Sequence, residues 1–163
     1  MIDGLKIHFV SIVDNANNMV PSLGTRIWHY QNFVNGLLKD KTCIMGRKTY
    51  DITQWKGSKS WVMTRNRNWR KSGVGTLHSI DDIHLFCEDE DIYVLGGKSL
   101  FDNFQSYVDT LHLYIINNNE GSIPWIDFDM KKWSPSEYVN NNIWSFARLE
   151  KNKKGKTRQK AIR

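Results

Sequence analysis

Short runs of apolar, β-branched and aromatic residues alternate with helical patterns along the first two thirds of the chain. Strands are predicted by these runs at residues 7–13, 42–45, 61–64, 75–78, 92–95, 111–116 and 143–149. Three helices are predicted between them. The first is indicated by apolar residues at helical spacing, Ile27, Tyr30, Val34 and Leu37, and the second begins at Ser79 and has an apolar stripe of Ile80, Ile83 and Phe86. The third follows Gly97 and has apolar residues at Leu100, Phe101 and Phe104. Strands separated by helices imply right-handed crossovers, and therefore a mostly parallel sheet covered on both faces.

The last third of the chain has a different pattern. The predicted strands at 111–116 and 143–149 are linked by the turn-rich stretch 117–133, which has no helical period. An antiparallel pair at one edge of the sheet is the natural interpretation. The sequence shows no internal repeat and no linker, so we predict a single α/β domain over residues 1–150 followed by a tail at 151–163.

The positive charge of the chain is concentrated in that tail. Residues 151–163 hold seven of the 23 Lys and Arg residues and no acidic residue, which leaves 16 basic and 17 acidic residues in 1–150. The body of the protein is therefore nearly neutral. We interpret the tail as a short disordered basic extension that aids solubility, with contact to an anionic partner such as a nucleic acid as the lesser alternative.

Composition narrows the setting further. At 163 residues and 40% hydrophobic content, the chain can bury roughly two thirds of its unfolded surface in one domain. No apolar run approaches the roughly 18 to 20 residues of a membrane span, and the start of the chain lacks the layout of a signal peptide. Cys43 and Cys87 stand in no metal or redox spacing. These features predict a cytoplasmic, monomeric protein with buried reduced thiols, no metal site and a small-molecule ligand.

Three of the predicted strands are followed by a basic residue within the next three positions. Arg47 follows Gly46, Arg65 follows Thr64, and Lys98 follows the pair Gly96-Gly97. The carboxyl ends of parallel strands meet at one edge of a sheet, where ligands bind, and glycines there let backbone N–H groups approach an anion. The pattern therefore predicts a polyanion site. Because guanidinium groups bind phosphate and no acidic residue stands at these turns to bind a bare ribose, NADPH is favoured over NADH.

Three segments together resemble the dihydrofolate reductase family. They are Ile-Met-Gly-Arg-Lys-Thr-Tyr at 44–50, Val-Leu-Gly-Gly-Lys at 94–98, and Val-Asp-Thr-Leu-His-Leu at 108–113 with Glu120-Gly121 beyond it. The resemblance covers roughly residues 5–150. It implies an eight-stranded, mostly parallel sheet with flanking helices, and an enzyme of tetrahydrofolate biosynthesis that uses NADPH to reduce 7,8-dihydrofolate by hydride transfer.

The resemblance also implies roles for the residues at the strand ends. The cofactor's phosphates and nicotinamide amide would be held by Gly46, Arg47 and Thr49. The adenosine 2′-phosphate would be surrounded by Thr64, Arg65 and Lys98. A cis Gly-Gly turn would be formed by Gly96 and Gly97, with Phe101 packed beside the nicotinamide ring. The motifs of the cofactor half are all present.

The substrate half departs from the family pattern. Phe33 matches the aromatic residue that stacks on the pterin, but the family's acid, four residues earlier, is replaced by His29. No Asp or Glu occurs between Asp14 and Asp40, so a shift of register cannot restore the acid. Tyr114 stands where the family has a Thr that supports the acid, and Ser58 stands where it has an Arg that binds the folate glutamate. Ser22 replaces the Trp that usually follows the loop proline. The predicted substrate-binding residues are Phe33, Ser58, Val10 and Leu95.

The missing carboxylate leaves three hypotheses. A carboxylate accepts two charge-assisted hydrogen bonds from the pterin edge, each worth about 1.5 to 3 kcal/mol, whereas a neutral imidazole offers one acceptor. The first hypothesis is a dihydrofolate reductase in which His29 orients the ligand or is an ordinary helix residue. The second keeps NADPH but changes the substrate to another pyrimidine or pterin heterocycle. The third is a non-catalytic binding or structural protein.

Overall fold

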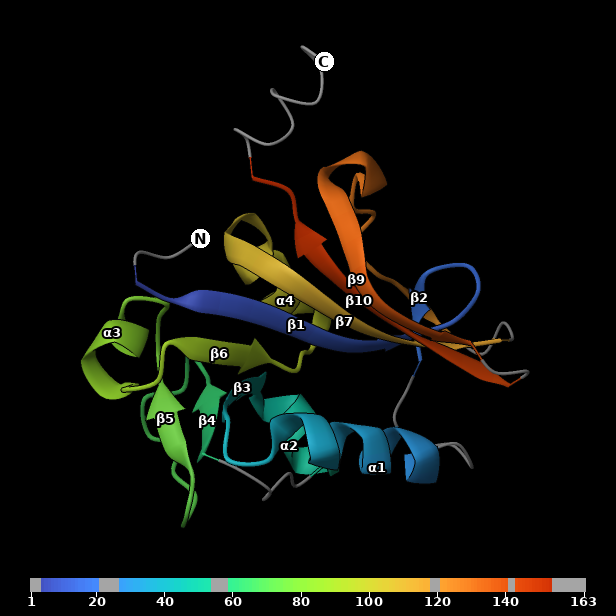
Figure 1. The fold of residues 1–163 in the computed structure, drawn as a ribbon. Helices are drawn as coiled ribbons and strands as arrows, with labels where there is room; N and C mark the ends of the chain where they lie inside the picture. The colour runs from blue at the N-terminus through green and yellow to red at the C-terminus, as the bar shows by residue number, and fades with distance from the viewer. Residues whose placement is uncertain (1–3, 21–26, 54–58, 118–120, 141–142, 154–163) are drawn as a thin grey trace.

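The computed structural model describes residues 4–20, 27–53, 59–117, 121–140 and 143–153, with backbone alone for 27–31, 33, 52 and 53. Within these ranges, eight strands form a continuous sheet in the order β5-β4-β3-β6-β1-β7-β10-β9 (Figure 1). Their bounds are β1 Lys6–Val13, β3 Thr42–Gly46, β4 Lys59–Met63, β5 Gly75–Leu77, β6 Asp91–Val94, β7 Val108–Ile116, β9 Trp133–Asn140 and β10 Trp144–Lys151. Two short strands, β2 (Asn18–Met19) and β8 (Ile123–Pro124), pair with each other, and β2 also pairs with β1.

The strand directions follow the predicted change along the chain. The neighbours from β5 to β7 are all parallel, whereas β7, β10 and β9 are joined by antiparallel pairings. The predicted mixed α/β fold with an antiparallel C-terminal edge is confirmed. The central strands β6, β1 and β7 are buried along nearly their whole length, as expected for parallel strands covered on both faces.

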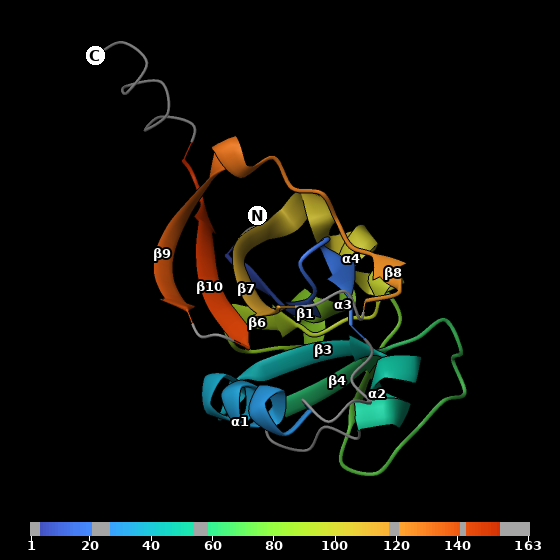
Figure 2. The same cartoon turned by 90° about the vertical axis from the view of Figure 1, so that its right-hand side faces the viewer.

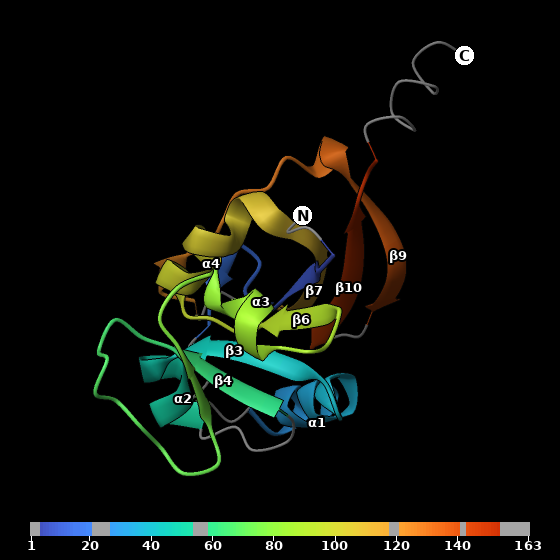
Figure 3. The same ribbon diagram turned by 90° about the vertical axis from the view of Figure 1, so that its left-hand side faces the viewer.

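Four helices cover the two faces. In Figures 2 and 3, α1 (Ile27–Leu38) and α2 (Arg47–Thr53) lie below β3, while α3 (Asp82–Phe86) and α4 (Lys98–Phe104) lie above it. Neighbouring residues of β1 point into different layers: Phe9 packs in the cluster that includes the α3 and α4 side chains, and Val10 packs in the cluster that includes α1 and α2 side chains. Short 3₁₀ helices at Gln105–Tyr107 and Met130–Lys132 complete the described elements.

Three local predictions were incomplete or wrong. The sequence did not predict β9, whose seven residues after Trp133 are exposed and which belongs to the sheet through backbone pairing with β10. It also missed α2, because seven residues are too few to show a helical period. Helix α3 does not begin at Ser79 but at Asp82, whose Oδ2 accepts hydrogen bonds from the backbone N–H groups of His78 (2.8 Å) and Ser79 (3.1 Å). These hydrogen bonds to the Asp82 carboxylate favour a turn ahead of the helix. Phe86 was predicted in the buried apolar stripe of this helix, but its side chain is 54% exposed.

Both cysteines are free thiols, Cys43 buried and Cys87 partly buried. No helix in the described part of the chain is long and apolar enough to cross a membrane. Strand β10 ends at Lys151, and the rest of the predicted tail, 154–163, lies outside the described residues.

Candidate active site

The carboxyl ends of β4, β3 and β6 lie side by side at one edge of the sheet. These strands are parallel neighbours, with Met45 opposite Val62 and Ile44 opposite Val94. Beyond the ladders, Leu95 N–H donates to Ile44 O at 2.9 Å, and Gly46 N–H donates to Gly96 O at 2.7 Å. The sheet order thus brings together the three strand ends that the sequence marked by their basic residues.

Three glycines line this edge of the sheet, with Gly46 and Gly97 partly exposed and Gly96 buried. Gly96 has φ +111°, and a Cβ built there would lie 3.1 Å from Cε2 of Phe101. A Cβ on Gly97 would lie 3.5 Å from Oγ1 of Thr49, and one on Gly46 would lie 3.6 Å from the nitrogen of Gly97. The Gly96–Gly97 peptide bond is cis. Each of these Cβ positions faces another part of the protein, so the missing side chains let the strand ends, Thr49 and Phe101 pack closely together. Gly46 and Gly97 are themselves partly exposed, which leaves backbone at this edge within reach of a ligand.

Phe101 packs beneath Gly96 from inside the core. Its ring is fully buried and packs against Phe9 with ring centroids 4.9 Å apart and against Trp125 at 5.5 Å. The sequence placed Phe101 beside the nicotinamide; the structure places it directly beneath Gly96. A substitution at Gly96 would therefore press into a tightly packed aromatic cluster.

The basic residues surround the same edge. Arg47 begins α2, Arg65 follows β4, and both are exposed. Lys98 begins α4 and lies 3.3 Å from a carboxylate oxygen of Asp102, one helical turn away. Such a half-exposed pair is worth little, so the Lys98 ammonium can turn to an incoming anion at small cost.

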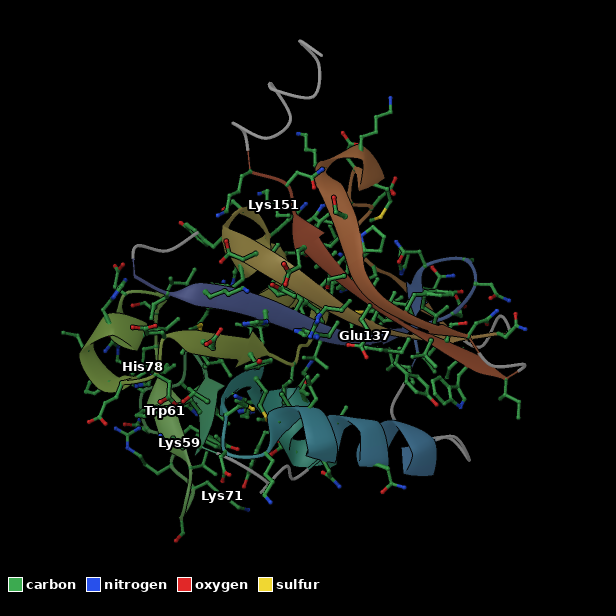
Figure 4. The ribbon with its side chains drawn as sticks, in the orientation of Figure 1. Lys59, Trp61, Lys71, His78, Glu137 and Lys151 are labelled. Atoms are coloured by element: carbon green, nitrogen blue, oxygen red, sulfur yellow. The ribbon has the colours of Figure 1, made fainter. Side chains whose placement is uncertain are left out.

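Sequence reasoning did not single out His78, which lies next to this group. Thr64 N–H donates to Leu77 O at 2.9 Å, and Nδ1 of His78 lies 2.8 Å from the carbonyl oxygen of Thr64. A carbonyl only accepts, so Nδ1 carries the proton and donates to it, and Nε2 of the neutral ring is left as an acceptor. Figure 4 shows His78 at the β5 end of the sheet. The signal in the sequence was its place as the last residue of the strand predicted at 75–78.

The predicted substrate-side residues whose side chains the structure describes are buried or partly buried. Val10 is fully buried, while Leu95 packs against the same cluster and remains partly exposed. Tyr114 is 2% exposed, and its ring stacks on Trp144 with centroids 5.2 Å apart. Of the remaining predicted residues, His29 and Phe33 lie on α1 with only their backbone described, and Ser58 falls outside the described residues.

A buried carboxylate ties the loop after β1 to the segment before β8. Asp14 is 2% exposed; its Oδ1 accepts from the N–H groups of Ala16 (2.9 Å) and Asn18 (3.0 Å), and its Oδ2 accepts from Gly121 N–H (2.9 Å). Burial acts to raise the pKa of Asp14, but these hydrogen bonds outweigh it, and the pKa lies below its ordinary value. No role for Asp14 could be predicted from the sequence, because the contact with Gly121 joins residues 107 positions apart.

The fold and the strand-end motifs have counterparts among known proteins. The sequence model of dihydrofolate reductase matches residues 10–152. The chain belongs to the dihydrofolate reductase family. It is 25% identical over 145 residues to dihydrofolate reductase of Staphylococcus aureus strain Mu50, covering 85% of this chain and 86% of that protein. It is 26% identical over 134 residues to that of Bacillus subtilis strain 168, covering 78% and 79%.

A solved structure supports the same fold. The dihydrofolate reductase of Enterococcus faecalis, complexed with NADP(H) and RAB-propyl, superimposes with a TM-score of 0.78 at 17% identity, covering 92% of this chain and 98% of that chain. Family membership makes the protein an oxidoreductase of the dihydrofolate reductase type. The resemblance inferred from the three sequence motifs is confirmed.

Proposed function

We propose that the protein binds NADPH at the carboxyl ends of β4, β3 and β6 and reduces 7,8-dihydrofolate to tetrahydrofolate. The observation that carries the proposal is the glycine-lined edge around Gly46, Gly96 and Gly97, bordered by exposed Arg47 and Arg65. The relative from Enterococcus faecalis was solved with NADP(H), which supports the choice of cofactor. When bound, NADPH supplies the hydride from its nicotinamide ring.

Different residues of the chain would bind the different parts of the cofactor and the substrate. The backbone at Gly46, Gly96 and Gly97 would receive the nicotinamide and pyrophosphate, with Thr49 beside Gly97. The 2′-phosphate would be held by Arg65, Lys98 and Thr64, with Arg47 beside the phosphates. Phe33 would stack on the substrate from α1, and solvent would protonate N5 of the pterin.

Arg65 provides a direct test of cofactor selection. We expect Arg65→Gln to weaken NADPH binding about 10- to 100-fold, because one charge-assisted contact is lost, and to leave NADH binding unchanged. Binding can be followed by quenching of tryptophan fluorescence. The matched control is Arg70→Gln: Arg70 is also exposed, but its Nη1 donates to the carbonyls of Arg67 (3.1 Å) and Trp69 (2.7 Å). Equal losses for NADPH and NADH would contradict the assignment.

The reaction itself is tested by oxidation of NADPH in the presence of dihydrofolate. Turnover above background at high enzyme concentration is the expected result. Tight NADPH binding without such turnover would leave the cofactor site standing and overturn the proposed substrate.

The missing acid favours a second candidate, reduction of a different pyrimidine or pterin heterocycle with the same cofactor. His29 occupies the position where the family acid would pair with the pterin, and a site that lacks a hydrogen-bonding partner can lose a factor of roughly 10⁴ to 10⁵ in specificity. His29→Asp distinguishes the two. A large gain in dihydrofolate turnover favours a site altered for another substrate, whereas a loss favours a working histidine in the dihydrofolate reductase; His84→Asp, on the exposed side of α3, is the control.

A further inference from the structure

Two histidines face each other within the central strands of the sheet. His8 of β1 and His112 of β7 are 5% and 3% exposed, and Nδ1 of His8 lies 3.0 Å from Nε2 of His112. The other nitrogen of His8, Nε2, lies 2.7 Å from Oδ1 of Asp91 on β6. The ring of Tyr93 stacks on His8 with centroids 4.2 Å apart and planes 10° from parallel. A single chain of contacts, Asp91 to His8 to His112, thus crosses β6, β1 and β7.

The hydrogen-bond chemistry fixes where the protons lie. A carboxylate of Asp91 only accepts, so Nε2 of His8 carries its proton, and in the neutral ring Nδ1 of His8 must accept. His112 must then donate from Nε2, which leaves its Nδ1 as an unprotonated acceptor. This Nδ1 is fully enclosed and has no hydrogen-bond partner among the described residues. With both imidazoles neutral, the two contacts of the chain are satisfied.

An added proton has no satisfactory place in this arrangement. If His8 gains a proton at Nδ1, two N–H donors oppose each other across 3.0 Å unless His112 moves its own proton to Nδ1. In that case a donor replaces the acceptor at the enclosed Nδ1, still without a partner. If His112 is protonated instead, a charged ring is buried away from the carboxylate. Each outcome leaves either a broken contact or an uncompensated polar group in the interior, which is costly.

The neighbouring charges only partly offset this cost. The carboxylates lie mainly at the His8 end of the pair. The guanidinium of Arg148 and the ammonium of Lys6 disfavour a positive charge on His112. The groups that face the pair are Asp91 and Tyr93 of β6, Lys6 of β1, Asp109 of β7, and Arg148 and Glu150 of β10. Arg148 lies opposite His112 in the ladder and reaches Glu137 of β9 at 3.8 Å; Figure 4 labels Glu137 on this outer hairpin.

The pKa values point the same way. The pKa of His112 is lowered to about 3, mainly by burial, with the charges of His8, Arg148 and Lys6 acting in the same direction. Burial also lowers the pKa of His8, although its bond to Asp91 opposes the effect. Since the unfolded chain has ordinary histidines, acid favours the unfolded state.

We propose that the Asp91–His8–His112 chain is an acid-sensitive latch on the central sheet, closed while both imidazoles are neutral and released when the pair takes up protons. The three strands that it joins lead into the candidate site, since Gly96 follows β6, Val10 lies on β1 and Tyr114 on β7. Release of the latch would therefore loosen the site together with the sheet. The proposal concerns folding and does not depend on which substrate the protein reduces.

The test is the pH dependence of unfolding by urea, followed by tryptophan fluorescence. From about pH 8 to about pH 5 we expect the unfolding constant to rise about 30-fold from His112 alone, given its ordinary pKa of 6.5 in the unfolded chain. Replacing both rings, in His8→Leu/His112→Leu, should reduce this dependence to less than about 3-fold, because the two imidazoles that take up protons on unfolding are removed. Neither leucine leaves an unpaired nitrogen in the interior. The control is His84→Gln on the exposed side of α3, which should keep the full dependence. An unchanged dependence in the double variant would overturn the proposal.

Nitrogen NMR of the wild-type imidazoles provides a second measurement that needs no variant. We expect both rings as the neutral Nε2–H form at neutral pH, with protonation of His8 below pH 6.5 and of His112 only near pH 3. Protonation of either ring at or above pH 6.5 in the folded protein would equally overturn the latch.

Discussion

The backbone N–H of Gly121 donates a 2.9 Å hydrogen bond to Oδ2 of Asp14, a residue 107 positions earlier. A Cβ on Gly121 would lie 2.6 Å from the Cβ and O atoms of Asn18 and 2.7 Å from the same Oδ2, so only glycine fits. The β2–β8 pairing continues this contact: Ser122 N–H donates to Met19 O at 3.1 Å. The loop after β1 is thus fixed to the segment that leads into β8.

We predict that Asp14→Asn destabilises the protein by about 1 to 3 kcal/mol at neutral pH. An asparagine can still accept from Ala16 and Asn18 through its oxygen, but its NH₂ group then opposes the N–H of Gly121, which is left unsatisfied. Unfolding by urea measures the effect. Asp127→Asn, an exposed carboxylate in the neighbouring segment, is the control and should change stability by less than about 0.5 kcal/mol.

The Asp14 contribution should also depend on pH. Because the folded pKa is lower than the ordinary 3.8, the stabilisation is complete above that value and is lost as the pH falls through the lower folded pKa. The stability gap between wild type and Asp14→Asn should therefore narrow in acid. A gap that stays constant from about pH 7 to about pH 3 would show that charge is not the cause.

Gly96→Ala should impair both stability and NADPH binding. At φ +111° an alanine is strained, and its Cβ would lie 3.1 Å from a ring carbon of Phe101. We expect a loss of about 1 to 3 kcal/mol in stability and at least tenfold weaker NADPH binding. Gly36→Ala is a matched control, because a Cβ at this α1 position meets nothing within 4 Å and alanine favours a helix. Normal NADPH affinity in Gly96→Ala would contradict the proposed cofactor surface.

Gly75→Ala should destabilise the edge of the sheet through Trp61. The two residues are directly opposite on β5 and β4, and a Cβ on Gly75 would overlap the indole ring of Trp61. Trp61 in turn stacks on Phe86 with centroids 6.1 Å apart. We expect a cost of about 1 to 3 kcal/mol from this overpacking. In a double-mutant cycle with Trp61→Leu the cost of Gly75→Ala should largely disappear, whereas additive effects would point to the backbone instead.

Cys87 should react slowly with alkylating reagents. Burial raises the pKa of its thiol to about 11, with the charge of Asp89 acting in the same direction. At about pH 8 only about one thiol in a thousand is ionised, so modification by iodoacetamide should be slow and should accelerate about tenfold per pH unit. Mass spectrometry after timed exposure measures the rate, with Cys87→Ser as the control for labelling elsewhere. Fast modification at neutral pH would contradict the buried environment.

Several features of the fold could be predicted because their signals are local. The apolar run at 92–95, which is followed by Gly96-Gly97, and similar runs followed by Arg47 and Arg65 predicted parallel strands whose ends carry the ligand chemistry. The sheet order β4-β3-β6 confirmed that these ends are neighbours. Strand β9 was missed because the exposed Ser-Pro-Ser-Glu stretch after Trp133 has no apolar alternation, and only pairing with β10 makes it a strand.

The sequence by itself determined the class of fold, the glycines and cations of the cofactor side, and the absence of an acid on the first helix, because each is written in residue type and spacing. The tertiary structure alone decided that Asp14 reaches Gly121, that His78 joins Thr64, and that His8 meets His112 and Asp91. These contacts join segments from 14 to 107 positions apart, and a hydrogen bond formed across such a distance depends on the register of strands that no local pattern records.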